Sequence, residues 1–178
     1  MAGGQEIERK FLLDALPPAL ALARRKAILQ GYLALDGDTE VRVRRTPAGS
    51  MLTIKHGGGL VRVEEELVLD ARQADALWEL TEGRRVQKSR RQMLVGGHDV
   101  SVDEYAGALD GLVVAEIEFD DEQAANGFAA PAWFGRELTG DPGYANRNLP
   151  STACPAMRPP ESRGRTHARL WIVARAIG

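Results

Sequence analysis

Hydrophobic and polar residues alternate along much of the first 120 positions of the chain. This period of two predicts β-strands, because successive side chains of a strand point to opposite faces of a sheet. Turn signals such as Asp36-Gly37, Pro47-Ala48-Gly49 and Gly96-Gly97 separate the runs and favour antiparallel hairpins. The expected strands cover residues 5–13, 28–34, 39–46, 51–56, 60–69, 85–95, 98–105 and 112–119.

Apolar residues at helical spacing replace this alternation in shorter segments. We expect helices over residues 14–27, with Asp14 as the N-cap, over 71–82 and over 120–128. Proline and glycine interrupt residues 130–149, which are expected to hold Trp133, Phe134 and Tyr144 against the fold.

The chain of 178 residues is long enough for one domain with a sizeable core. We expect this domain to span residues 1–150, followed by a flexible linker and a C-terminal tail with a short helix over 151–178. Docking of that helix at one mouth of the fold is a further hypothesis. Eight strands is a number that closes into a small barrel. The predicted fold class is therefore α+β, an eight-stranded antiparallel β-barrel with helices packed outside.

Charged residues in the predicted strands fall on one face. In the first strand Glu6, Glu8 and Lys10 share a face, whereas Ile7 and Phe11 share the other. The same separation recurs in the later strands. The charged positions there are Arg42, Arg44, Lys55, Arg62, Glu64, Glu66, Lys88, Arg90, Asp103, Glu116 and Glu118. One face of the sheet is therefore rich in charges of both signs.

A charged face can simply be the solvated side of an antiparallel sheet. Two features favour a lumen instead. Barrel closure puts one face inside, and the helices need the apolar face outside. Buried charges also need partners, and a polyanion held by Lys and Arg, with divalent metals held by carboxylates, satisfies both signs. The pattern indicates a metal-phosphate site, with cross-strand ion pairing as the alternative.

Overall charge and cysteine content limit the classes of partner and the compartment. Lys plus Arg total 23 against 25 for Asp plus Glu, so no basic excess predicts nucleic-acid binding. The single cysteine, Cys154, fits a reducing compartment. Charge begins at Glu6, before any apolar leader, and the chain has no run of about 18 apolar residues. We expect a cytoplasmic protein that binds neither membrane nor nucleic acid; a homodimer is left open.

An ordered series of motifs resembles the CYTH superfamily, also called triphosphate tunnel metalloenzymes. The first, Glu6-Ile7-Glu8-Arg9-Lys10, matches a Glu-x-Glu-x-Lys signature that would be weak alone. The resemblance covers roughly residues 5–150. The further segments are Gln30-Gly31-Tyr32-Leu33, Val41-Arg42-Val43-Arg44, Leu52-Thr53-Ile54-Lys55, Arg62-x-Glu64-x-Glu66, Lys88-Ser89-Arg90 and Ala115-Glu116-Ile117-Glu118-Phe119.

This resemblance implies an antiparallel tunnel that binds a triphosphate-bearing small molecule with Mg²⁺ or Mn²⁺. The expected metal ligands are Glu6, Glu8, Glu64, Glu66, Asp103, Glu116 and Glu118. The expected triphosphate-binding residues are Lys10, Arg42, Arg44, Lys55, Arg62, Lys88 and Arg90. Lys55, Tyr32 and Glu66 are the expected catalytic residues, with aromatic packing as an equal alternative role for Tyr32.

The same tunnel serves several activities, and the fold does not choose among them. The compact length, QGYL at 30–33, EGRR at 82–85 and PAWFG at 131–135 look most like short bacterial enzymes that hydrolyse inorganic tripolyphosphate. We therefore expect an inorganic triphosphatase. Alternatives are an adenylate cyclase of the fourth class, a thiamine or nucleoside triphosphatase, and a binding module for polyphosphate or nucleotides without turnover.

Overall fold

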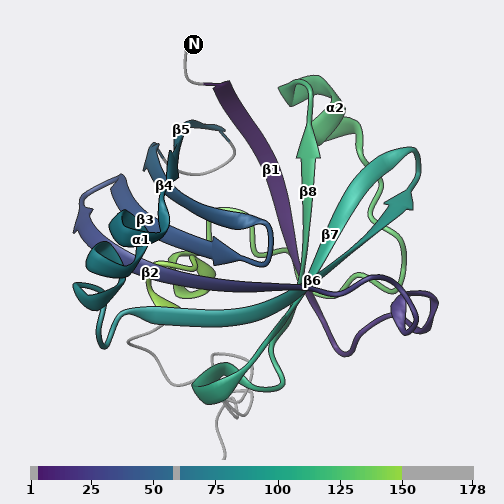
Figure 1. Ribbon diagram of the computed structural model, residues 1–178. Helices are drawn as coiled ribbons and strands as arrows, with labels where there is room; N and C mark the ends of the chain where they lie inside the picture. Colours follow the sequence, from purple (N-terminus) through teal and green to yellow (C-terminus); the bar gives the residue numbers. More distant parts are fainter. Residues whose placement is uncertain (1–3, 58–60, 150–178) are drawn as a thin grey trace, which may run out of the picture.

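Eight antiparallel strands close into a barrel in the computed structural model, which describes residues 4–57 and 61–149 (Figure 1). The strands are β1 (Gly4–Leu13), β2 (Lys26–Asp36), β3 (Thr39–Thr46), β4 (Gly49–His56), β5 (Val61–Leu69), β6 (Arg85–Val95), β7 (His98–Tyr105) and β8 (Val113–Phe119). Their order around the ring is β1-β5-β4-β3-β2-β6-β7-β8. β1 pairs with both β5 and β8, which closes the ring and confirms the predicted fold class.

The main apolar core lies outside the barrel wall. Side chains from the outer face of β1, β7 and β8, including Phe11, Val102 and Ile117, pack beneath the covering segments. Those segments contribute Leu20 from the 3-10 helix η1 (Pro18–Leu20) and Ala125 from helix α2 (Glu122–Gly127). The apolar face is thus used for packing, as the alternation along these strands predicts.

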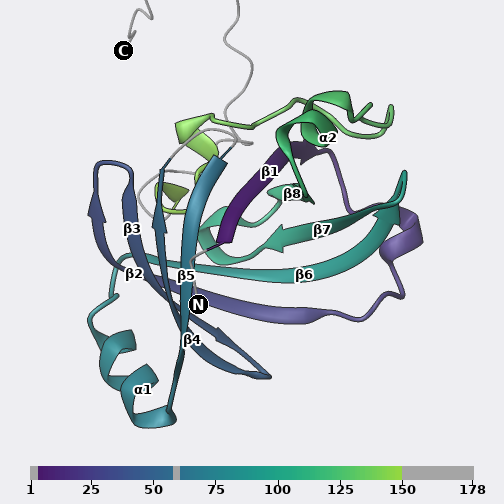
Figure 2. The ribbon, with the colours of Figure 1, turned by 90° about the horizontal axis from the view of Figure 1, so that it is seen from above.

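Two α-helices lie on opposite sides of the barrel (Figures 1 and 2). Helix α1 (Ala71–Glu79) begins with a capping box, in which the Asp70 carboxylate accepts from the backbone N–H of Gln73 and the Gln73 side chain accepts from that of Asp70. It packs against β3 and β4. Helix α2 begins at an Asp121 N-cap and packs against β1 and β8.

The helix predicted over residues 14–27 is wrong. Only η1 forms there, and β2 already begins at Lys26. Pro17 and Pro18 remove two backbone donors, and Leu22 is 100% exposed, so the segment presents no continuous apolar face that a longer helix could bury. The helices predicted over 71–82 and 120–128 are present but shorter.

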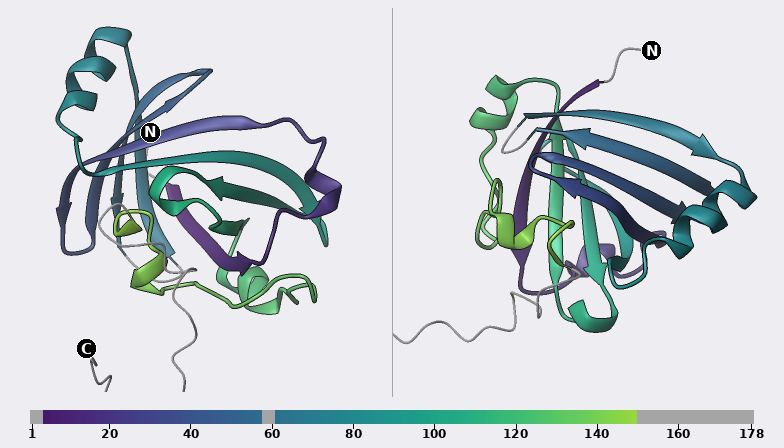
Figure 3. Two further views of the ribbon diagram at one scale, coloured as in Figure 1. Left: turned by 90° about the horizontal axis from the view of Figure 1, so that it is seen from below. Right: turned by 90° about the vertical axis from the view of Figure 1, so that its left-hand side faces the viewer.

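The segment after α2 runs along the barrel and then across one of its ends (Figure 3). Gly135 donates its N–H to the carbonyl of Leu12, and Leu138 donates to that of Lys10, which attaches the segment to β1. The 3-10 helix η3 (Pro142–Tyr144) follows. As predicted for residues 130–149, Phe134 and Tyr144 are buried, whereas Trp133 is 42% exposed.

An apolar plug fills the covered end of the barrel. It combines Tyr32, Val86, Tyr105 and Val114 from four strands with Leu109, Leu112, Leu138, Tyr144 and Leu149 from the connecting segments. Tyr32, Val86 and Val114 have the same parity as residues of their own strands that line the lumen, so they belong to the inner face.

The linker and helix predicted beyond residue 150 lie outside the described residues. Within the described part of the chain, no helix has the length and apolar character needed to cross a bilayer.

Candidate functional site

A cavity of about 660 Å³ occupies the barrel lumen. Thirteen of the fifteen side chains expected at the site line it. Seven are cationic, namely Lys10, Arg42, Arg44, Lys55, Arg62, Lys88 and Arg90, and six are carboxylates, namely Glu6, Glu8, Glu64, Glu66, Glu116 and Glu118. The remaining two, Tyr32 and Asp103, do not line the cavity. The charged face of the strands is therefore the inner face.

Exposure of the lining residues increases away from the plug. On β6, Val86 belongs to the plug, the Lys88 side chain is 2% exposed and that of Arg90 is 22% exposed. The same gradient runs from buried Glu116 to exposed Glu118 on β8. The described residues thus form a cavity that is covered at one end and reached by solvent from the other.

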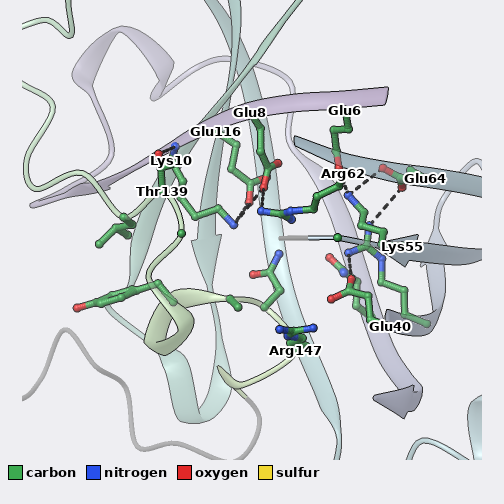
Figure 4. A pocket seen from close by; sticks show the side chains of 18 of the residues that line it. Glu6, Glu8, Lys10, Glu40, Lys55, Arg62, Glu64, Glu116, Thr139 and Arg147 are labelled. Carbon is green, nitrogen blue, oxygen red and sulfur yellow. Dashed lines mark hydrogen bonds and ion pairs between the residues drawn. The ribbon is translucent and has the colours of Figure 1, made fainter. Parts of the chain in front are cut away.

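Lys55 lies between two carboxylates (Figure 4). Its Nζ is 2.6 Å from Glu6 Oε2 and 2.8 Å from Glu64 Oε2, although only 5% of the residue is exposed. Arg42 Nη2 approaches the same Glu64 carboxylate at 3.6 Å. Strands β1, β3, β4 and β5 thereby converge on one group of charges.

A second group of charges spans β1, β6 and β8. Lys10 Nζ is 3.0 Å from Glu116 Oε1, and Arg90 Nη2 is 2.5 Å from Glu116 Oε2. Burial alone would raise the pKa of Glu116, but the positive charges of Lys10, Lys88 and Arg90 hold this pKa well below its ordinary value. Glu116 is therefore a stable anion deep in the lumen.

Asp103 is fully buried and does not line the cavity, although it shares the inner face of β7 with Tyr105. It accepts two hydrogen bonds from Arg90, at 2.8 and 2.7 Å, and one from Lys88 at 2.5 Å. These contacts fix both cations from behind. Its position favours a role in orienting Lys88 and Arg90 over the expected role as a direct metal ligand.

Tyr32 lies in the apolar plug, with no exposed surface. Its hydroxyl makes no hydrogen bond of standard geometry with any described residue, and burial raises the pKa of this phenol although the nearby Arg42 guanidinium opposes the rise. Its cross-strand neighbour is Arg42. No direct contact joins Tyr32 to Lys55 among the described interactions, so the geometry supports a place at the floor of the cavity for this side chain.

The carboxylates near the open end carry an excess of negative charge. Glu8 and Glu118 are direct cross-strand partners on β1 and β8, an unfavourable position for like charges. Burial and the negative charge of Glu6 raise the pKa of Glu118, and Glu8 adds to this effect. A hard divalent cation would compensate this repulsion, and carboxylate oxygens are its preferred ligands.

The carboxylates nevertheless do not form a finished cage. Among the described residues, no three Asp, Glu, His or Cys side chains are arranged to hold a metal ion. Glu6, Glu8 and Glu116 are instead paired with Lys or Arg. The donor chemistry therefore fits Mg²⁺ or Mn²⁺, provided that these carboxylates exchange their present partners for the ion.

Sequence reasoning missed part of the lining. Gln30 and Glu40 could have been included, because Gln30 shares the parity of Tyr32, and Glu40 that of Arg42 and Arg44. No strand alternation marks residues 138–149, the segment that covers one end of the barrel. It lines the cavity with residues that include Asp141 and Asn146. Thr139 and Arg147 of the same segment are labelled in Figure 4.

Comparison with known proteins identifies close relatives over most of this chain. An inorganic triphosphatase of Nitrosomonas europaea is 42% identical over 146 residues, which are 81% of this chain and 95% of that protein. An inorganic triphosphatase of Acetivibrio thermocellus is 40% identical over 148 residues, which are 82% of this chain and 93% of that protein. No family model matches the sequence.

The fold also matches a solved structure. The crystal structure of an inorganic triphosphatase superposes with a TM-score of 0.63 at 36% identity, over 84% of this chain and 96% of that chain. The similarity in sequence and the similarity in fold therefore point to the same group of proteins.

Proposed function

The chain belongs to the inorganic triphosphatases of the CYTH superfamily, and from this premise we propose that it hydrolyses inorganic tripolyphosphate to pyrophosphate and phosphate in a metal-dependent reaction. The observation that carries the proposal is the lumen itself. Among the described residues, eight Lys and Arg and nine Asp and Glu line a single cavity of about 660 Å³. Such a mixture suits a polyanion bound together with cations.

The cationic side chains would bind and orient the triphosphate. Lys10, Arg42 and Lys88 lie deep, and each is held by neighbouring carboxylates, so their positions are fixed before substrate arrives. Phosphoryl transfer depends mainly on such positioning and on neutralising the charge of the transferred group. Burial strengthens these interactions, because water screens them less.

Lys55 is the residue that we propose to act at the reacting phosphoryl group. It is almost fully buried, and its ammonium is held by Glu6 and Glu64. A phosphate oxygen can replace one of these carboxylates without moving the lysine. Attack by water on phosphorus then breaks the P–O bond to the leaving pyrophosphate, and Lys55 offsets the charge that develops.

We propose Glu6, Glu8, Glu116 and Glu118 as the residues that hold Mg²⁺ or Mn²⁺, with Glu64 and Glu66 as further ligands. When bound, such an ion supplies charge neutralisation at the phosphate oxygens and lowers the pKa of a bound water. Glu66 accepts from Thr53 and pairs with Arg44 at 3.1 Å, so its carboxylate is already oriented toward the cavity.

Phosphate release from tripolyphosphate, ATP and thiamine triphosphate tests the proposal. Each substrate is incubated with Mg²⁺, Mn²⁺ or a chelator, and cyclic AMP formation is followed in parallel. We expect fast release from tripolyphosphate that requires the metal. Cyclic AMP formation would instead indicate a cyclase, and tight binding without release would indicate a binding module.

Lys55→Met provides the matching site variant. Loss of the ammonium removes charge stabilisation at the reacting group, so kcat for tripolyphosphate should fall at least about 100-fold. The melting temperature and the tripolyphosphate affinity are measured alongside. A near-normal rate in a folded Lys55→Met protein would contradict the role of Lys55.

Location and assembly remain part of the proposal. The single cysteine of the chain supports a cytoplasmic location. The expected ligand is a small triphosphate with no nucleic acid, and a homodimer is left open. Size measurement in solution at several protein concentrations would determine the oligomeric state.

A further inference from the structure

Three unpartnered polar atoms gather at the inner end of the cavity. They are Gln30 Nε2, Tyr32 Oη and Arg42 Nε, and each is buried with no hydrogen-bond partner among residues 4–57 and 61–149. Gln30 and Tyr32 are two positions apart on β2 and therefore share its inner face. Arg42 is the cross-strand partner of Tyr32 on β3. The three atoms thus belong to one small region of the wall.

Gln30 combines burial with access to the cavity. Only 2% of the residue is exposed, yet it is among the residues that line the lumen. Its side chain makes no described hydrogen bond, which is unusual because buried amides are normally paired. An acceptor for this amide is therefore expected to come from a molecule that enters the cavity.

The surroundings of Gln30 offer donors and apolar groups. Its cross-strand partners are Arg44 on β3 and Val86 on β6. Lys88 lies two positions from Val86 on the same face of β6. A ligand that satisfies Gln30 here would also meet these positive charges, so an anionic oxygen fits better than a neutral carbonyl.

We propose that Gln30 is a substrate-binding residue that donates through Nε2 to an oxygen of the terminal phosphoryl group. The proposal rests on the proposed function and extends it to one further residue and to the orientation of the substrate. Gln30 borders the apolar plug through Val86 and Tyr32, so the phosphoryl group that reaches it is the one that enters first. The substrate class is a triphosphate with at least one unsubstituted terminal phosphoryl group.

A neutral donor at this position complements the Lys and Arg side chains. Charged groups attract the triphosphate strongly but accept several positions of its oxygens. An amide held on a barrel strand donates from a fixed place without adding charge. Gln30 therefore positions the terminal phosphoryl group, whereas the surrounding cations supply the attraction.

Two variants with similar size test the proposal. Gln30→Met removes the donor, and Gln30→Glu replaces it with a negatively charged acceptor. Gln87→Met is the control, because Gln87 is an exposed residue of the opposite parity on β6. Steady-state rates with tripolyphosphate and the metal, calorimetric affinity for tripolyphosphate with a chelator, and melting temperatures are measured for all four proteins.

We expect kcat/KM of Gln30→Met to fall about tenfold to a hundredfold, the range for a lost hydrogen bond to a charged group. Gln30→Glu should fall further, and its affinity for tripolyphosphate should also drop. The melting temperature of free Gln30→Glu should be unchanged or higher, because the new carboxylate lies near Arg44 and Lys88. A melting temperature that is unchanged or higher, together with a lower affinity for tripolyphosphate, distinguishes a substrate-binding role of Gln30 from a structural role.

Unchanged kinetics and affinity in both Gln30 variants would overturn the inference, and would assign the unpartnered amide to a water molecule. A parallel loss of melting temperature and affinity in both would overturn it as well, in favour of a structural role. Failure of the proposed function is a separate result, since it appears in the wild-type protein as absent phosphate release. If the wild type binds tripolyphosphate without releasing phosphate, the affinities alone still decide the role of Gln30.

Discussion

The carboxylates of Glu8 and Glu118 face each other across β1 and β8 in a protein that otherwise pairs most of its lumen charges. Among the described ion pairs none includes Glu118, whereas Glu8 Oε1 lies 2.7 Å from Arg62 Nη2. The raised pKa of Glu118 reflects burial and the nearby carboxylates. At the scale of single residues, this local repulsion is the observation that best supports the proposed cation site at the open end.

The variant Glu118→Gln tests the hypothesis that Glu118 helps to bind a cation. Removing one of two opposed charges should raise the melting temperature of the metal-free protein by about 1–3 °C. The same variant should show a smaller rise on addition of Mg²⁺ or Mn²⁺ than the wild type, since it lacks one oxygen anion. Thermal unfolding with chelator and with each metal measures both effects.

Glu65→Gln on the opposite face of β5 is the matched control, and neither effect is expected there. An equal metal-induced rise in wild type and Glu118→Gln would contradict the assignment of Glu118 as a ligand.

Arg9 shows how an outward-facing charge is used. Its guanidinium donates to both carboxylate oxygens of Glu137 at 2.8 Å, and to the carbonyls of Ala125 and Phe128 at 3.0 Å. The hydrogen bonds from Arg9 lower the pKa of Glu137 against the opposing effect of partial burial. One side chain of β1 thereby holds α2 and the segment that follows it.

This lowered pKa predicts a pH dependence of stability. The contribution of Glu137 is complete above the ordinary carboxylate pKa of about 4.5 and is lost as the pH falls through the lower pKa of the folded state. Glu137→Gln should therefore lower the free energy of unfolding at pH 7 by about 0.2–1 kcal/mol, a small value because the pair is solvent-screened. Urea unfolding from pH 7 to pH 3 should show the difference disappearing, and a constant difference would contradict it.

At the scale of elements, the strands follow the sequence closely because most of them have one apolar and one charged face. Alternation of this kind fixes the register of strand pairing. A shift by one residue would turn Val43 or Ile117 out of the apolar core and turn the lumen charges into it. The helix predicted over 14–27 does not form because no surface of the barrel covers Leu22, although the apolar residues there have helical spacing. Packing decides such short segments.

Tertiary packing also explains why the sequence does not predict the lining residues of the covering segment. Thr139 and Arg147 lie in an irregular segment, where neither a period of two nor one of 3.6 indicates which side chains point inward. Only the contacts of this segment with β1 and the β2–β3 turn, such as Arg147 donating to the Gly37 carbonyl, place it across the barrel.

The packing of α1 against the barrel depends on a glycine. A Cβ atom at Gly31 would lie 2.4 Å from Thr81 Oγ1 and 2.6 Å from Thr81 Cβ. Thr81 is buried and donates to the carbonyl of Trp78 just after α1. β2 and the end of α1 therefore approach more closely than any larger residue at position 31 allows.

Gly31→Ala should destabilise the protein by about 1–3 kcal/mol, the usual cost of overpacking. Thr81→Gly removes the atoms that clash, so the double variant should be less destabilised than the sum of the two single variants. Denaturant unfolding of the four proteins measures this coupling. If the two changes in unfolding free energy simply add in the double variant, the close approach of Thr81 to position 31 is not the reason that Gly31→Ala is destabilising.

At the scale of the whole molecule, the described residues build the closed barrel, its outer core and its apolar plug. Leu149 is buried in the apolar plug, and relatives of the chain match 81–82% of its length. The barrel, its outer core and its plug are all formed by described residues, which supports a proposed domain boundary near residue 150.

A chain that ends at Pro150 should fold and hydrolyse tripolyphosphate with unchanged kcat and KM. Melting temperature and steady-state rates of the shortened and full-length proteins check this expectation. A large loss of turnover or affinity on truncation would instead support the hypothesis that the C-terminal residues act at a mouth of the barrel.

Residues 138–149 cover one end of the barrel and thereby restrict the route by which substrate enters and products leave the cavity. Among the described residues, solvent reaches the cavity mainly from the opposite end, so the two products of one cleavage share that route out. The product nearer the opening must depart before the deeper one can follow. Release is therefore ordered, and the outer product, when abundant in solution, delays both the departure of its partner and the arrival of the next substrate.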